Sequence, residues 1–195
     1  VVNHEAKTAY TDAGATANDT VDGNITANIT TVSTVDVNVK GTYTVTYNVT
    51  DNAGLHASQV TRTVNVVDTT GPVVSINGNQ NVTIEAGSTY TDLGAIAVDS
   101  YDGNVSVNTV NNVNSNQKGS YTVVYTTQDA EGNTTTATRN VEVVDTTGPT
   151  ITLNGDANVI HEAKVAYVDG GATATDVHDG DITANIVPTS TVDIN

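Results

Sequence analysis

The chain has 195 residues, and its 22 acidic and 6 basic residues give a formal net charge of −16. A chain this acidic lacks the positive surface that nucleic acid or an anionic membrane attracts, so we expect neither as a partner. It contains no cysteine, methionine, tryptophan or phenylalanine, which excludes disulfides and thiolate metal sites. No stretch approaches the ~18 continuous apolar residues of a membrane-spanning helix, so we expect no membrane insertion.

An internal repeat runs through the whole chain. The heptapeptide VVDTTGP occurs twice, and longer segments around it recur with small changes in loop length. The matching segments are His4–Thr26, Ile84–Ser106 and His161–Thr183, together with Lys40–Gly54 and Lys118–Gly132. We therefore expect three tandem domains: residues 1–70, which lack an opening segment, residues 71–147, which are complete, and residues 148–195, which lack a closing segment.

Each copy reads as short strands in chain order. In Thr42–Asp51, apolar and aromatic residues alternate with threonine and asparagine, which is typical of a strand with one buried face. Val60–Val67 and Thr138–Val144 are expected closing strands. Pro72–Asn77 and Thr150–Asn154 are expected opening strands, and Pro72 stands at the first position of its strand, where proline is tolerated. No stretch has a sustained helical period, so the pattern predicts an all-β, antiparallel sandwich in each copy.

A recurrent tyrosine makes this prediction more specific. In immunoglobulin-like (Ig-like) sandwiches, a tyrosine near the start of the penultimate strand ties its hydroxyl back to the preceding corner. Tyr43 and Tyr121 stand two residues before Val45 and Val123 and two residues after the glycine of a Lys-Gly corner, which fits this role. We expect the two valines to be buried where other Ig-like domains carry a disulfide.

The combined motifs DTTGP, IEAG-x-TYTD, D-x-x-DG, KG-x-YTV and VVD resemble the bacterial Ig-like repeat named after a pesticidal crystal protein. They are also similar to the hyalin-type repeats of surface proteins. This resemblance covers essentially the whole chain. It implies tandem Ig-like sandwiches of seven strands, an extracellular or cell-surface location in large surface proteins or adhesins, and no catalytic activity.

Aspartates recur in three motifs. The connector VVDTTGP carries one, the D-x-x-D-G motif carries two, and the D-x-x-G turn carries one. In chain order these residues are Asp19, Asp22, Asp51, Asp68, Asp99, Asp102, Asp129, Asp145, Asp176 and Asp179.

The Ig-like topology places these motifs at one end of each domain. The D-x-x-D-G motif falls in the B–C loop and the D-x-x-G turn in the F–G loop, both at the end where the chain enters. We expect convergence at two joints: Asp68 with Asp99, Asp102 and Asp129, and Asp145 with Asp176 and Asp179. Carboxylates that close repel one another unless a cation lies among them, and Ca²⁺ accepts about 6–8 oxygen ligands. The sequence thus predicts Ca²⁺ at the joints, with ordinary turn hydrogen bonding as the alternative.

Six other acidic residues are weaker candidates for the cation site. Asp12, Asp92 and Asp169 follow a recurrent tyrosine, and Glu5, Glu85 and Glu162 also recur. For the three glutamates, pairing with lysine or arginine across strands is the alternative.

These patterns predict a structural module of an extracellular stalk, filament or adhesin, in which repeats contact mainly their neighbours. Neighbouring repeats of the same or another copy of the chain are the expected partners. The alternative is a module that binds a glycan or a surface protein through its loops, in which Tyr101 is the one loop aromatic. No nucleophile motif such as G-x-S-x-G is present, so we expect no enzyme. Because both end domains lack strands, we expect a longer protein, or strands donated between molecules.

Overall fold

The computed structural model describes residues 1–193 of the chain. Short strands and two single-turn 3-10 helices make up the ordered elements, and these residues contain no α-helix and no helix that could cross a bilayer. The all-β expectation is confirmed. The elements are β1 (Val2–Glu5), β2 (Asn18–Asp19), β3 (Gly23–Asn24), η1 (Thr26–Asn28), β4 (Thr30–Ser33), β5 (Gly41–Asn48), β6 (Val60–Val67), β7 (Val73–Ile76), β8 (Asn81–Glu85), β9 (Ala95–Asp99), β10 (Gly103–Val105), β11 (Val107–Asn111), β12 (Gly119–Gln128), β13 (Thr134–Val144), β14 (Thr150–Leu153), β15 (Ala172–Asp176), β16 (Gly180–Asp181) and η2 (Thr183–Asn185).

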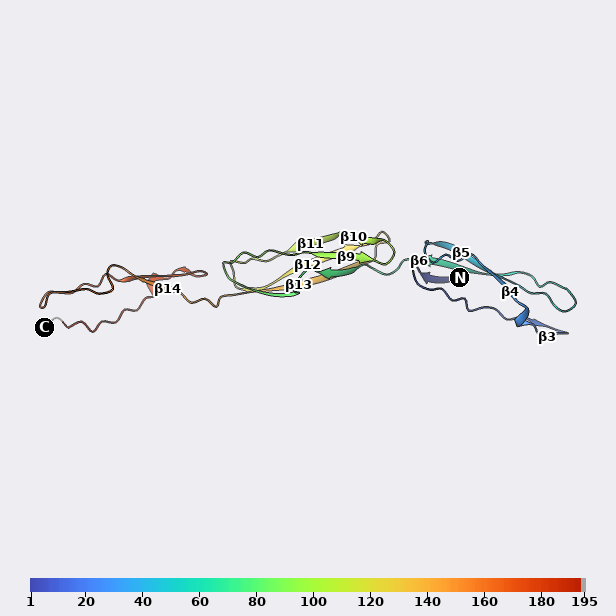
Figure 1. The fold of residues 1–195 in the computed structure, drawn as a ribbon, viewed down its shortest axis with the longest axis horizontal. Helices are drawn as coiled ribbons and strands as arrows, with labels where there is room; N and C mark the ends of the chain where they lie inside the picture. The colour runs from blue at the N-terminus through green and yellow to red at the C-terminus, as the bar shows by residue number, and fades with distance from the viewer. Residues whose placement is uncertain (194–195) are drawn as a thin grey trace. The chain divides into compact units, whose positions relative to one another are not determined.

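The repeat in the sequence is also a repeat of sheets (Figure 1). The first copy has a four-stranded sheet in the order β1-β6-β5-β4, and the second has the matching order β8-β13-β12-β11. A three-stranded sheet, β10-β9-β7, belongs to the second copy, and β16-β15-β14 is its counterpart in the third. The first copy has only the short pair β2-β3 at that place.

Most strand pairs are antiparallel, as expected, but one pair in each four-stranded sheet is parallel. β1 runs parallel to β6 from Val2 opposite Val64 to Glu5 opposite Val67. β8 runs parallel to β13 in the same way. The sequence pattern did not reveal this direction, because no hairpin turn joins these strands and a turn is what signals an antiparallel neighbour.

The expected strand positions agree closely with the structure. β6 spans Val60–Val67 as predicted, whereas β13 begins at Thr134 and so precedes the predicted Thr138. The tyrosine hydroxyls form the predicted corner bonds, since Tyr43 donates to the Val39 carbonyl at 2.8 Å and Tyr121 to the Gln117 carbonyl at 2.9 Å.

The apolar core of each four-stranded sheet consists of valines and one tyrosine. Val45, Tyr47 and Val64 are buried together in the first copy. Val123 and Tyr125 take the equivalent places in the second copy and are also buried. The prediction of buried valines two residues after the corner tyrosines is therefore confirmed.

The aspartate that follows the recurrent tyrosine binds polar groups at this core. Asp12 accepts a hydrogen bond from the Tyr47 hydroxyl and forms an ion pair with Arg62. In the second copy the same network joins Asp92 to Tyr125 and to Arg139. Asp12 and Asp92 are thus bound to cationic and phenolic groups of their own copy, which explains their recurrence.

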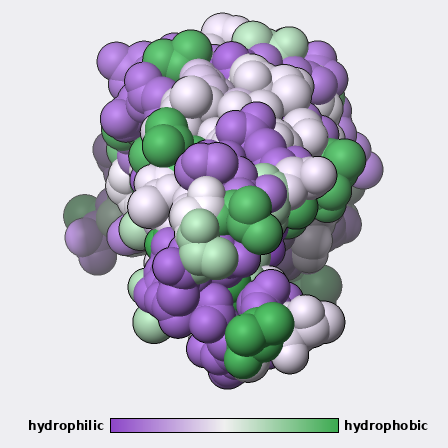
Figure 2. All heavy atoms as spheres, turned by 90° about the vertical axis from the view of Figure 1, so that its right-hand side faces the viewer, coloured by the Kyte–Doolittle hydropathy of each residue, from purple (hydrophilic) through white to green (hydrophobic). Residues whose placement is uncertain are grey.

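The chain folds as two compact units. The first comprises Val1–Ser75, Ala95–Asn108 and Thr126–Ala137, and the second comprises Ile76–Gly94, Thr109–Tyr125 and Thr138–Asn195. The first unit thus holds the first copy together with β9, β10 and neighbouring loop and strand segments of the second copy. The surface in Figure 2 intersperses hydrophobic side chains among hydrophilic ones without one large apolar patch on the face shown.

Candidate cation-binding joint

Three buried aspartates meet in the first compact unit. Asp68 directly follows β6, Asp99 ends β9, and Asp129 directly follows β12. Their side chains are 5%, 3% and 8% exposed, and each offers a carboxylate oxygen within 4.8 Å of the others. The structure therefore brings together the connector aspartate and the two loop aspartates, as expected from the topology.

Asp99 and Asp129 are each held by their own turn. Asp99 Oδ1 accepts hydrogen bonds from the backbone amides of Tyr101 at 2.7 Å and Asp102 at 3.0 Å. Asp129 Oδ1 accepts from the Asn133 amide at 2.7 Å, and its Oδ2 accepts from Asn133 Nδ2 at 2.7 Å. Although burial raises the pKa of Asp129, the hydrogen bonds from Asn133 and its neighbours hold the pKa below its usual value. Turn chemistry thus explains why these two residues are aspartates.

Asp68 is different, because none of the residues that the structure describes lies within hydrogen-bond distance and geometry of its carboxylate oxygens. Both oxygens of Asp68 and Oδ2 of Asp99 are buried and unpartnered. Burial, followed by the negative charges of Asp99 and Asp129, raises the pKa of Asp68 to about 6, and the nearby Thr70 amide opposes this shift only in part. A buried carboxylate without a partner is costly unless it is protonated or bound to a cation.

A second set of carboxylates surrounds Asp68 on the exposed side. Asp102 and Glu131 each offer an oxygen within 4.8 Å of Asp68 and of one another. Asp102 Oδ2 also accepts a hydrogen bond from the Ala130 amide at 2.8 Å, which ties the two loops of the second copy together. The repeat pattern does not point to Glu131, because the first copy has Ala53 at that position of the turn.

Tyr101 lies between lysines of the first copy and is not a free loop aromatic. Lys40 Nζ lies 4.2 Å from the ring centroid and Lys7 Nζ lies 5.5 Å from it. The Lys40 amide donates to the tyrosine hydroxyl at 3.3 Å, and Lys40 also forms an ion pair with Glu131. Within this unit, Tyr101 therefore contributes to the joint through cation–π contacts.

The first copy repeats the loop half of this arrangement. Asp19, Asp22 and Asp51 each offer an oxygen within 4.8 Å of the others, but all three are only half-buried. Asp19 Oδ1 accepts from the Val21 and Asp22 amides, and Asp22 Oδ2 accepts from the Asn52 amide. This group contains no connector aspartate.

The second joint, within the second compact unit, is built differently. Asp145 is grouped with His178 and Asp179, and Lys118 Nζ lies 3.3 Å from Asp145 Oδ2. Asp176 is not in this group. Its Oδ1 accepts hydrogen bonds from the amides of Asp179 and His178, and these bonds lower its pKa. The side chain of His178 is mostly buried. The predicted convergence of Asp145 with Asp179 is present, and that with Asp176 is not.

The recurrent glutamates hold the connectors. Glu5 accepts hydrogen bonds from the amides of Thr69 and Thr70. Glu85 likewise accepts from the Thr146 amide at 2.7 Å and the Thr147 amide at 2.8 Å. Glu5 and Glu85 therefore bind the threonine amides after the closing strand, and the alternative of pairing with lysine or arginine is not what the structure shows for them.

Comparison with known proteins gives the family. Residues 2–66 and 74–143 match the bacterial surface protein, Ig-like domain family in two adjacent copies. The chain belongs to this family. The match is to Ig-like repeats of bacterial surface proteins as a class, and it does not single out the pesticidal-crystal-protein type.

Solved structures and curated proteins add little to the family assignment. A lipoprotein from Bacteroides thetaiotaomicron shares 26% identity over 40% of this chain and 39% of that chain, with a TM-score of 0.36. The M60 catalytic domain with the CBM51-1 and CBM51-2 domains of ZmpB from Clostridium perfringens shares 14% identity over 89% of this chain and 32% of that chain, at a TM-score of 0.47. Human CDH23 EC21-23 shares 16% sequence identity over 85% of this chain and 71% of that chain, with a TM-score of 0.33. No curated protein matches the chain.

Proposed function

We propose that this surface Ig-like chain is a non-catalytic structural segment of an extracellular stalk, filament or adhesin, and that Ca²⁺ stiffens the joints between its repeats. In this proposal the repeats are residues 1–70, 71–147 and 148–195. They are Ig-like repeats of the pesticidal-crystal-protein type. The observation that carries this proposal is the unpartnered carboxylate of Asp68, buried beside Asp99 and Asp129.

Ordinary turn chemistry does not account for Asp68. It explains Asp99 Oδ1 and both oxygens of Asp129, whose hydrogen bonds are local. It leaves three buried oxygens, two on Asp68 and one on Asp99, without a donor. A cation with several oxygen ligands and flexible geometry satisfies all three at once, and Ca²⁺ has these properties.

Such a cation would tie the connector to the loops of the next repeat. Asp68 belongs to the connector after β6, whereas Asp99 and Asp129 belong to the β9–β10 and β12–β13 loops. At a free concentration of 100 times its Kd, a ligand that binds only the folded state adds about 2.7 kcal/mol of stability. That is a large fraction of the stability of a small domain without disulfides.

The test is calcium binding by the full chain, measured by isothermal titration and by thermal unfolding in EDTA and in millimolar Ca²⁺. Asp68→Asn should bind one Ca²⁺ fewer than the parent chain and lose most of the rise in melting temperature. Asp36→Asn is the matched control, because Asp36 only accepts a hydrogen bond from the Asn38 amide. Equal calcium binding by the parent chain and Asp68→Asn would refute the calcium joint.

A second candidate function is recognition of a glycan or surface protein through the loops. An open cavity of about 500 Å³ among loops of the first copy favours it. A glycan array probed with the full chain tests this candidate, and binding that is lost when cavity residues change would support it.

A further inference from the structure

Asp68 belongs to two groups of carboxylates within the first compact unit. The inner group joins it to Asp99 and Asp129, and the outer group joins it to Asp102 and Glu131. Asp68 is 5% exposed, and neither of its oxygens has a hydrogen-bond partner among the described residues. Because a carboxylate has two oxygens, Asp68 can serve both groups at the same time.

The cation that meets the outer group in the structure is the ammonium of Lys40. Lys40 Nζ forms an ion pair with Glu131, and both side chains are about a quarter exposed. The hydrogen bond to Glu131, together with the charges of Glu131 and Asp102, raises the pKa of Lys40 above its ordinary 10.5. Lys40 Nζ also lies 4.2 Å from the centroid of the Tyr101 ring, whose hydroxyl accepts from the Lys40 amide at 3.3 Å. The lysine is therefore held beside the outer group through its side chain and its backbone.

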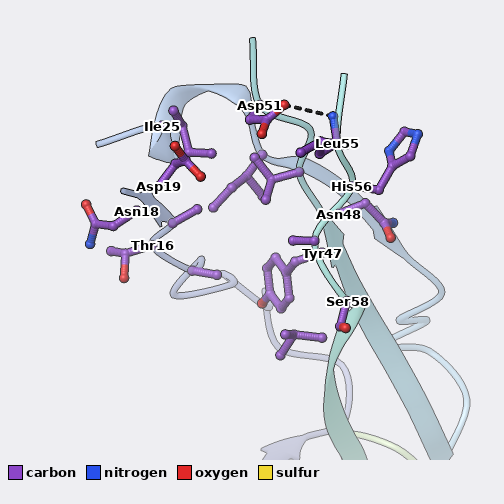
Figure 3. A pocket seen from close by; sticks show the side chains of 16 residues that line it. Thr16, Asn18, Asp19, Ile25, Tyr47, Asn48, Asp51, Leu55, His56 and Ser58 are labelled. Carbon is purple, nitrogen blue, oxygen red and sulfur yellow. Dashed lines mark hydrogen bonds between the residues drawn. The ribbon is translucent and has the colours of Figure 1, made fainter. Parts of the chain in front are cut away.

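The first copy has the corresponding loops without an outer group. Asp51 occupies the position of Asp129, and Ala53 occupies that of Glu131. Figure 3 shows Asp51 accepting a hydrogen bond from the Leu55 amide, at 2.7 Å, beside the cavity of this copy. The outer group is thus a feature of the second copy, where a lysine of the first copy reaches it.

The two groups carry more negative charge than a single cation offsets. They contain five carboxylates, because Asp68 is common to both. One divalent ion compensates for two negative charges, and the ammonium of Lys40 compensates for one. Carboxylates that lie this close together repel one another and favour protonation unless cations offset their charge. The outer group therefore has the charge and the oxygen ligands for a divalent ion of its own, and Ca²⁺ binds such ligands.

We propose that the outer group is a second Ca²⁺ site, which the ammonium of Lys40 keeps closed in the parent chain. The inference rests on the proposed calcium joint, because Asp68 is a ligand of both sites. The joint then takes one cation from solution and one from the preceding repeat. Lys40 therefore sets how many ions the joint holds, and it couples cation binding at the connector to the docking of the first copy.

The test counts the Ca²⁺ ions that bind to the full chain in isothermal titration. Lys40→Met and Lys40→Gln each remove the ammonium and keep an unbranched side chain, so each should bind one Ca²⁺ more than the parent chain. Lys40→Arg keeps a cation and should bind the parent number. Lys7→Met is the matched control, because it removes a positive charge that lies 5.5 Å from the same Tyr101 ring, and it should also keep the parent number.

Two further variants locate the additional ion. Glu131→Gln combined with Lys40→Met should return the chain to the parent number, because the outer group has then lost the carboxylate that Lys40 binds. Terbium(III) in place of Ca²⁺ should give stronger tyrosine-excited emission in Lys40→Met than in the parent chain. Tyr101→Phe in the Lys40→Met background should remove that increase, because Tyr101 lies beside the outer group.

The same titration distinguishes this inference from the proposed calcium joint. An unchanged number of ions in Lys40→Met and Lys40→Gln overturns the second site, even where Asp68→Asn loses an ion and the joint stands. A gain that Glu131→Gln does not reverse also overturns it, because the extra ion then lies elsewhere. A gain in Lys40→Met without any loss in Asp68→Asn supports the outer site and refutes the inner ion alone.

Discussion

In the second copy, buried polar residues connect the strands beside a small apolar core. Arg139 is 2% exposed, forms an ion pair with Asp92, and donates through Nε to the Asn79 carbonyl at 3.0 Å. Tyr125 donates to the same carboxylate at 2.6 Å, and burial together with that hydrogen bond raises the pKa of Tyr125. One guanidinium therefore binds both the aspartate that follows the recurrent tyrosine and the segment that follows β7.

Replacement of this arginine should strongly destabilise the fold. Arg139→Met leaves the Asp92 carboxylate without its cation, and breaking a buried pair costs about 3–5 kcal/mol. Arg62→Met removes the same pair in the first copy, where the side chains are about a quarter exposed, so it should cost less. Urea unfolding of the two variants measures the difference, and equal losses would contradict this account.

Asp68 should make the metal-free protein sensitive to pH. The pKa of Asp68 is about 6 in the folded chain and near its ordinary 3.8 in the unfolded chain. The folded state therefore binds this proton more tightly, and the associated stability is full below about pH 4 and lost as the pH rises through 6. In EDTA, Asp68→Asn should become more stable relative to the parent chain as the pH is raised from 4 to 7. Thermal unfolding across this range measures it, and a constant difference would contradict the raised pKa.

At the scale of elements, each connector is fixed by the repeat that it leaves. Glu85 at the end of β8 accepts the two threonine amides that follow β13, and Glu5 does the same after β6. These bonds satisfy amides that the parallel strand pair leaves free at its end. The segment DTTGP is therefore held at its start instead of being a flexible linker.

Glu85→Gln should weaken this attachment in a pH-dependent way. Hydrogen bonds from Thr146 and Thr147 lower the pKa of Glu85 to about 2. The stability from this carboxylate is present above its ordinary pKa of 4.5 and is lost as the pH falls toward 2. The variant should be less stable than the parent chain at pH 7 and nearly equal to it near pH 2. Glu162→Gln is the control, because Glu162 is exposed, and an equal effect of both changes would contradict the prediction.

The strands and much of the first joint could be predicted from the sequence alone. The hydrogen bonds and ion pairs that hold the other recurrent acidic residues could not. The strands could be located from the alternation of apolar and polar residues in Thr42–Asp51 and from the corner tyrosines. Both are local signals, because they depend only on residues close together in the sequence. Convergence of Asp68 with Asp99 and Asp129 followed from Ig-like topology. The partners of Asp92 and Glu85 could not be predicted, because a recurrent carboxylate does not reveal whether an arginine, an amide or a cation faces it.

At the scale of the whole molecule, the best-defined connection between successive copies lies in the first compact unit. Lys40 and Lys7 of the first copy contact the Tyr101 ring, and Lys40 also pairs with Glu131. In the third copy His178 stands at the position of Tyr101, and Lys118 pairs with Asp145 instead. The two joints therefore share their connector sequence but differ in the residue that the lysine meets.

Tyr101→Ala should loosen the first joint without unfolding either copy. Cation–π contacts at partly exposed sites contribute about 0.5–1 kcal/mol each, so loss of the two contacts should make cleavage in Thr69–Gly71 by a nonspecific protease about 5–30-fold faster. Tyr101→Phe is the control, since it keeps the ring over the lysines and loses only the hydroxyl bond from the Lys40 amide. Unchanged cleavage in Tyr101→Ala would show that the lysine contacts do not restrain the connector.

The parallel pairing of β8 with β13 has a mechanical consequence. The chain enters β8 at Asn81 and leaves β13 at Val144, and in this register those residues lie at opposite ends of the pair. A pull on the two ends of the repeat therefore draws the strands past each other along their length. The hydrogen bonds between them are then loaded in shear and must break together, whereas a hairpin pulled at its open end unzips one bond at a time. β1 and β6 have the same geometry, so each such pair resists tension along the chain.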